Sequence, residues 1–90
     1  MSLTTEEKEY IKKIGKRIVQ FREKQNMKQI DLAIKLNIED SALRRLESGR
    51  TNPTIKTLLR IAIGLNIELK DLFDFQTKTE DVKKNLNIKP

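Results

Sequence analysis

The stretch that decides the fold of this chain is QIDLAIKLNIEDSALRRLESG, which runs from Gln29 to Gly49. Apolar residues recur in it at three- and four-residue spacing, a period that predicts amphipathic helices over 29–36 and 40–48. One side of each helix then carries the apolar residues, which are Leu32, Ala33 and Leu36 in the first and Leu43 and Leu46 in the second. Ile38 lies between the two runs and is expected to fill the turn that joins them.

The spacing of the two helices is typical of one particular motif. Two short helices that cross with a small residue at the contact, here Ala33, have the geometry of a helix-turn-helix. In that motif the second helix is presented outward and fits the major groove of DNA. The outward face of the second helix carries Ser41, Arg44 and Arg45. Because an arginine there can make a bidentate contact with guanine, we expect double-stranded DNA as the partner.

The composition limits what else the chain can do. Its 90 residues suffice for one small domain with one core, and they carry a net charge of +6. Since there is no cysteine and no histidine, thiolate and imidazole metal sites are excluded, and we expect no metal and no cofactor. The lack of those residues and of a phosphate-binding glycine loop also argues against an enzyme. We expect no small-molecule effector, because a single core leaves no second domain to house one.

The sequence lacks the features of a membrane or secreted protein. No apolar run approaches the ~20 residues of a membrane span, and the N-terminus has no apolar signal segment. We therefore expect a cytoplasmic protein with no membrane partner. The basic charge is spread along the chain, which fits a polyanionic partner without requiring one.

Three further helices are predicted outside the central stretch, over 6–25, 54–65 and 68–74, which makes an all-α chain of five helices. An apolar stripe runs along the first of them through Ile11, Ile14, Ile18 and Phe21. The fourth helix of the chain is expected to bury Ile55, Leu58, Leu59, Ala62 and Leu65. The fifth is apolar on the side of Leu69, Leu72 and Phe73.

Residues with special backbone roles mark the helix ends. Thr4 followed by Glu7 fits a capping box for the first helix, and Thr54 fits a cap for the fourth. Residues that tolerate the left-handed backbone are expected to end the helices, namely Asn26, Asn37, Gly49 and Asn66. Because the two central helices have only about two turns each, tertiary packing must hold them.

These boundaries divide the chain into three segments. Residues 1–13 are an N-terminal extension that includes the start of the first helix, and residues 14–74 form the helix-turn-helix domain. Residues 75–90 are a polar tail. Thr77 and Glu80 could cap one further short helix in the tail, and disorder is the alternative.

Taken together, these residues resemble the Cro/repressor-type (XRE-like, lambda-repressor-like) helix-turn-helix family. The resemblance is carried by Ile14-Gly15, Arg17-Ile18, Arg22, Gln29, Leu32-Ala33, Glu47, Gly49, Asn52-Pro53, Leu58, Ile61-Ala62 and Leu72-Phe73. It implies a compact five-helix DNA-binding domain that acts as a sequence-specific transcriptional regulator. Since family members usually act as dimers on two-fold symmetric operators, the narrower expectation is a dimeric repressor or controller-type protein.

The resemblance also implies roles for single residues. Arg22 and Glu47 resemble the pair that ties the first helix to the end of the recognition helix. Gln29 resembles a glutamine that binds a phosphate, and Lys28 stands before it where the family prefers Ser or Thr as a cap. The loop over 50–52 corresponds to the segment that meets the DNA backbone. The residues expected to bind DNA are therefore Lys28, Gln29, Asp40, Ser41, Arg44, Arg45, Arg50, Thr51 and Asn52.

Some of these residues have a structural interpretation as well. Asp40 is either a cap or a reader of cytosine, and it could form an exposed ion pair with Arg44. Arg44 and Arg45 could be solvated surface charges, and the lysines of the first helix are interpreted as a solvated face. Ile30 and Ile34 are either scattered exposed apolar residues or a small patch for a protein partner.

The C-terminal end has more apolar residues than one small core needs. We expect a homodimer through Ile63, Leu69, Leu72, Phe73 and Phe75. The alternative function is a protein-interaction module or an antitoxin built on the same fold, with the acidic start of the recognition helix in its favour. Salt separates the two functions, because a DNA complex weakens steeply with salt and an apolar protein contact does not.

Overall fold

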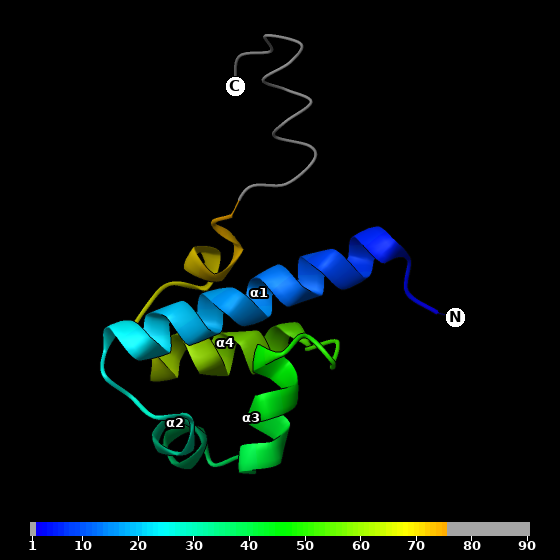
Figure 1. Ribbon diagram of the computed structural model, residues 1–90. Helices are drawn as coiled ribbons and strands as arrows, with labels where there is room; N and C mark the ends of the chain where they lie inside the picture. The colour runs from blue at the N-terminus through cyan, green and yellow to red at the C-terminus, as the bar shows by residue number, and fades with distance from the viewer. Residues whose placement is uncertain (1, 76–90) are drawn as a thin grey trace, which may run out of the picture.

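The computed structural model describes residues 2–75, which form four α-helices and one 3-10 helix (Figure 1). The elements are α1 (Thr5–Lys24), α2 (Gln29–Leu36), α3 (Asp40–Glu47), α4 (Ile55–Gly64) and the 3-10 helix η1 (Leu69–Phe73). No strand occurs over 2–75, so the predicted all-α class is confirmed for this part of the chain. No helix within it combines the length and apolar character that crossing a membrane requires.

The predicted fifth α-helix over 68–74 is wrong, because the structure has only the five-residue η1 there. Its hydrogen bonds join residues three apart, as the Asp71 N–H does with the Glu68 carbonyl at 3.0 Å. A segment of five residues has room for very few hydrogen bonds between residues four apart, which define an α-helix. The tighter 3-10 helix, with bonds between residues three apart, is common in such short segments. The predicted short helix or disorder in the tail lies outside the described residues from position 76 onward.

The predicted caps begin two of the helices. The Thr4 hydroxyl accepts a hydrogen bond from the Glu7 N–H at 3.1 Å, and the Glu7 carboxylate accepts one from the Thr4 N–H at 2.7 Å. This reciprocal pair is the capping box that the sequence predicted for α1. At α4 the Thr54 hydroxyl accepts from the Thr57 N–H at 3.1 Å. Both caps satisfy backbone donors that the first turn of a helix leaves unpaired.

The predicted stops end the helices in the left-handed backbone conformation. The φ angles are 57° at Asn26, 55° at Asn37, 56° at Asn66 and 75° at Gly49. The N–H of the following residue then donates to the carbonyl five residues earlier, as the Ile38 N–H does to the Ala33 carbonyl at 3.0 Å. At Asn37 this reversal makes the turn that joins α2 to α3.

The core lies where the helices meet, with α1 packed on α3 and η1, and α2 packed on α3 and α4. The largest fully buried side chains are Ile18, Leu32, Leu43, Ile61, Leu65 and Leu72. In Figure 1, α3 (green) runs steeply toward α1 (blue), and its C-terminal end is the end nearer to α1. A Cβ atom on Gly15 would lie only 2.5 Å from the Glu47 carbonyl oxygen, so α1 meets the end of α3 backbone to backbone.

The outer face of α4 differs from the prediction. Ile55 and Leu59 were expected in the core, but they are 64% and 46% exposed, and Ile61 is buried instead. Ile63 is also exposed, at 68%, and it follows Leu59 by one helical turn. Because α4 is apolar on both sides, its period alone does not tell which side faces the core. The outcome is an uncovered apolar stripe of Ile55, Leu59 and Ile63, which we call the α4 stripe.

Candidate nucleic-acid interface

The recognition helix α3 is held by one side and exposes the other. Leu43, Leu46 and Glu47 are buried, whereas Arg44 and Arg45 are exposed. The packing of α2 and α1 against the buried side fixes α3 in place. The predicted helix-turn-helix is therefore present, with the predicted arginines on its outward face.

An ion-pair network fastens the C-terminal end of α3. The Arg22 guanidinium donates to both carboxylate oxygens of Glu47, at 2.7 and 3.2 Å. It also donates to the Met27 carbonyl at 2.8 Å, which ties in the turn after α1. The side chains of Arg22 and Glu47 are only 11% and 5% exposed. The predicted pair is thus formed, and its bidentate geometry is the strong form of an arginine–carboxylate contact.

Gln29, the predicted phosphate-binding residue, belongs to the same network. Its side-chain amide donates to Glu47 Oε1 at 2.7 Å. The amide group has a second N–H and a carbonyl oxygen that this bond does not use. The Lys28 side chain makes no cap for α2, but the Asp31 carboxylate accepts from the Lys28 N–H at 2.8 Å and begins the helix in its place. The network therefore orients Gln29 at the start of α2.

The outward face of α3 carries two arginines, of which one forms an ion pair within the protein. Arg44 pairs with Asp40 at 3.3 Å, four residues back, and the side chains of Arg44 and Asp40 are 57% and 41% exposed. Within residues 2–75, Arg45 has no ion pair or side-chain hydrogen bond. The interpretation of Asp40 as a helix cap is wrong, because Glu39 is the N-cap residue and α3 has no side-chain cap. Ser41 lies beside Glu39, with 3.5 Å between the two side-chain oxygens.

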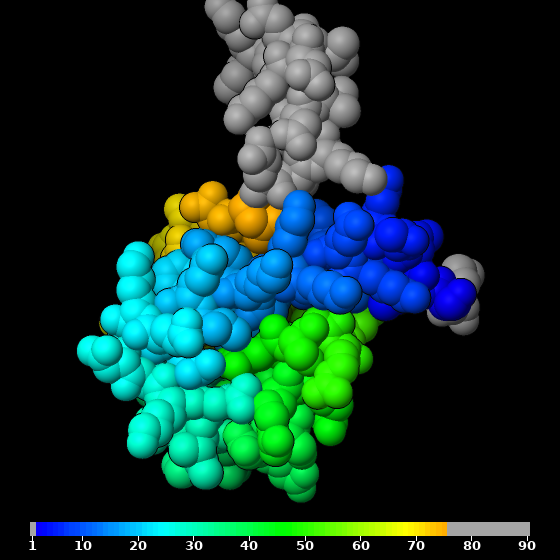
Figure 2. Space-filling view, viewed as in Figure 1, coloured from blue at the N-terminus to red at the C-terminus, as the bar shows by residue number. Residues whose placement is uncertain are grey.

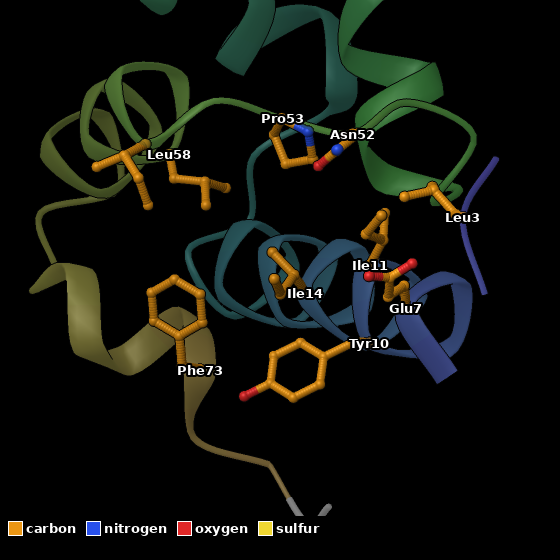
Figure 3. A pocket seen from close by; sticks show the side chains of 10 residues that line it. Leu3, Glu7, Tyr10, Ile11, Ile14, Asn52, Pro53, Leu58 and Phe73 are labelled. Atoms are coloured by element: carbon orange, nitrogen blue, oxygen red, sulfur yellow. The ribbon is translucent and has the colours of Figure 1, made fainter. Parts of the chain in front are cut away.

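The loop after α3 lies at the surface. Arg50 and Asn52 are exposed, Thr51 is half-buried, and the Arg50 guanidinium donates to the Ser48 hydroxyl at 2.9 Å. Figure 3 shows Asn52 and Pro53 facing the N-terminal part of α1 across an apolar hollow. The three predicted backbone-binding residues therefore sit next to the recognition helix.

The structure separates the five residues predicted for a dimer interface. Leu72 is completely buried in the core, so its assignment to an interface is wrong. Leu69, Phe73 and Phe75 are half-buried and pack against the same core. Only Ile63 is largely exposed, and it belongs to the α4 stripe.

Over residues 2–75 there is no cluster of acidic side chains that could hold a metal ion. Sequence reasoning missed the bond between Gln29 and Glu47, because their spacing of 18 residues gives no local signal. It also missed the fact that lysines of α1 border the loop over 50–52.

Comparisons with known proteins agree with this geometry. The family model for helix-turn-helix proteins matches residues 18–72. An uncharacterised helix-turn-helix-type transcriptional regulator of Archaeoglobus fulgidus is 37% identical over 59 residues, which are 66% of this chain and 83% of that protein. The immunity repressor protein of Bacillus phage phi105 is 30% identical over 76 residues, which are 84% of this chain and 53% of the repressor.

A solved structure is similar as well. The restriction-modification controller protein C.AhdI from Aeromonas hydrophila matches 70% of this chain and 96% of its own, with a TM-score of 0.68 and 28% identity. The fold and the exposed arginine face define a DNA-binding transcriptional regulator of the helix-turn-helix class. This chain belongs to the helix-turn-helix family.

Proposed function

We propose that this protein regulates transcription as a dimer that binds a two-fold symmetric site in double-stranded DNA, as a repressor or controller. Each subunit would insert α3 into a major groove, with the two half-sites about 34 Å apart. The observation that carries the proposal is the outward face of α3, which a buried network fastens from behind and which presents Arg44 and Arg45 to solvent. A cytoplasmic location and the absence of enzymatic activity belong to the same proposal.

The candidate DNA-binding residues divide into two roles in this proposal. Ser41, Arg44 and Arg45 would contact base edges, and Asp40 would hold Arg44 until DNA competes for it. Positioning on phosphates would come from Lys28, Gln29, Arg50, Thr51 and Asn52. Phosphate contacts fix the register of a protein on the duplex, whereas base contacts carry the sequence information.

Selection of binding sites from random duplex DNA tests the function directly. The wild-type protein at about 150 mM salt should enrich a two-fold symmetric site, because specific binding exceeds non-specific binding by at least about 10³. The same selection with Arg45→Ala should lose preference at one or two base pairs of each half-site, as expected for about 1–3 kcal/mol of lost discrimination.

Arg50→Ala is the matched control for that experiment. Because a phosphate contact carries no sequence information, this variant should weaken binding on every sequence and leave the selected site unchanged. Uniform weakening by Arg45→Ala would show that Arg45 touches only phosphate. No enrichment with the wild-type protein would overturn the function and favour a protein partner.

A dimer face is the remaining part of the proposal. The α4 stripe supports it, because Ile55, Leu59 and Ile63 repeat at four-residue spacing on an uncovered helix face. The half-buried Leu69, Phe73 and Phe75 would contribute their exposed edges. This surface replaces the interface expected from the sequence, from which Leu72 is removed.

A further inference from the structure

A hollow of about 280 Å³ lies between the N-terminal part of α1 and the loop that follows α3. Leu3 and Ile11 line it with apolar surface, and Lys8, Lys12 and Arg50 line it with three cationic side chains. No acidic side chain lines it. We call these three cations, which come from segments about 40 residues apart in the sequence, the α1 edge.

A close backbone contact holds the α1 edge together. A Cβ atom on Gly49 would lie 2.8 Å from Lys12 Cα and 2.6 Å from Lys12 Cγ, so α1 rests directly on the end of the α3 turn. The φ angle of 75° at Gly49 sets the direction in which Arg50 leaves that turn. In Figure 2 the blue surface of α1 lies directly against the green surface of this region. The position of Lys12 beside the loop is therefore built into the fold.

The cations of the α1 edge are available to a ligand. Lys8, Lys12 and Arg50 are exposed, and within residues 2–75 none of them forms an ion pair. The nearby Glu7 lines the neighbouring hollow in Figure 3 instead, where its carboxylate is bound to the N-cap of α1. Lys8 and Lys12 are one helical turn apart, which is about 6 Å along the axis of α1.

From this arrangement we infer that the α1 edge binds phosphates of the DNA strand that the loop over 50–52 meets, which extends the contact beyond the helix-turn-helix. The inference rests on the proposed function. A DNA strand offers phosphates at every ~3.4 Å of helix axis, so a row of cations one turn apart can meet different phosphates of one strand. Continuity with Arg50 and Asn52, which the proposed function places on the DNA backbone, favours DNA over a free anion.

Lys12 also has a purely structural interpretation. Its backbone lies beside Gly49, just after the C-terminal end of α3, where a cation stabilises the partial negative charge of the helix dipole. This role would affect the stability of the fold, but it would leave the dependence of DNA binding on salt unchanged. The two roles are therefore distinguished by measuring both properties on the same variant.

The test compares Lys8→Gln/Lys12→Gln with the wild-type protein. Binding to the selected duplex and to a random-sequence duplex is followed by fluorescence anisotropy between about 50 and 200 mM salt. Two lost phosphate contacts should make the slope of log affinity against log salt shallower by about 1.8 on both duplexes. The matched control is Lys35→Gln/Lys70→Gln, which removes the same charge from exposed positions outside the hollow and should keep the wild-type slope.

The outcomes separate this inference from the function on which it rests. Parallel slopes for the wild type and Lys8→Gln/Lys12→Gln would overturn the inference alone, and a lower unfolding temperature with parallel slopes would assign Lys12 the structural role. Failure of the wild-type protein to bind any duplex would overturn the proposed function as well. Equal loss of slope in the control would show a diffuse effect of net charge, which also overturns a site at the α1 edge.

Discussion

Glu47 is the residue on which the interface depends most. It accepts hydrogen bonds from two nitrogens of Arg22 and from the Gln29 amide, and its side chain is nearly inaccessible. The network thus joins the last turns of α1, the start of α2 and the end of α3. A buried carboxylate is stable only when such partners replace the water that it loses. Glu47 consequently holds α3 from its buried side.

Replacing Glu47 by Gln should destabilise the fold strongly. The amide would leave the Arg22 guanidinium buried without its counter-charge, and removal of one partner of a buried pair costs about 3–5 kcal/mol. Urea unfolding gives the free energy directly. The control is Lys70→Gln, which removes the exposed pair with Glu68 at 3.2 Å and should change the stability very little. A loss below about 1 kcal/mol in Glu47→Gln would mean that water reaches the site and solvates Arg22.

At the residue scale, the sequence predicted which residues have structural roles better than it predicted which residues touch each other. Arg22 and Glu47 were paired through a family resemblance, and the structure forms the pair. The capping role of Asp40 was wrong, because acids near a helix start are equally compatible with the N-cap and with the first turn. Long-range contacts such as that between Lys12 and Gly49 have no local signature, so only the folded chain reveals them.

At the element scale, asparagine adopts the left-handed backbone conformation that glycine often adopts at the ends of helices. Three asparagines adopt a positive φ, and each is followed by an apolar residue whose N–H bonds back across the last turn. Asn37 is the most consequential of them, because it makes the turn that sets α3 against α2. A strained residue at that point would disturb the position of α3.

Substitution at Asn37 should separate backbone strain from loss of the side chain. Asn37→Ala places a Cβ residue without a local polar group at a φ of 55°, so we expect a loss of about 1 kcal/mol. Asn37→Gly should keep or raise the stability, because glycine adopts this conformation freely. Thermal unfolding of the two variants beside the wild type measures the difference. Equal losses in both variants would instead assign the stability to the asparagine side chain.

Helices could be predicted from the sequence where the spacing of the apolar residues and the residues at the helix ends indicate the same bounds. The bounds of the four α-helices differ from the expected ones by at most one residue. Apolar spacing located each helix, and Thr, Asn or Gly marked every end except the starts of α2 and α3. The last segment has strong apolar residues but only five positions, and period cannot distinguish an α-helix from a 3-10 helix at that length. The prediction of which face of α4 is buried was wrong for a different reason, because two faces of this helix are apolar.

At the scale of the whole molecule, the α4 stripe should decide the oligomeric state. Sedimentation of the wild-type protein should give about twice the 10.5 kDa of one chain, because pairing covers the exposed apolar side chains. Ile63→Asp should sediment as a monomer and keep its helix content, since the side chain lies outside the core. Ile34→Asp, a change at an equally exposed isoleucine of α2, should stay dimeric. A monomeric wild type at micromolar concentration would contradict the interface.

The close approach of Gly15 to the Glu47 carbonyl has a consequence for how such a protein can evolve. The backbone contact with Gly15 and the buried residues Leu43, Leu46 and Glu47 hold α3 in place. All of them lie on the side of α3 opposite to the exposed arginines. Exposed positions far from these contacts usually change stability by less than about 0.5 kcal/mol when substituted. Under the proposed function, mutations at the exposed Arg44 or Arg45 would therefore alter the target site while the packing of α3 stays intact. A protein with this fold would then gain a new DNA target through substitutions at a few positions, and each variant along the way would remain folded.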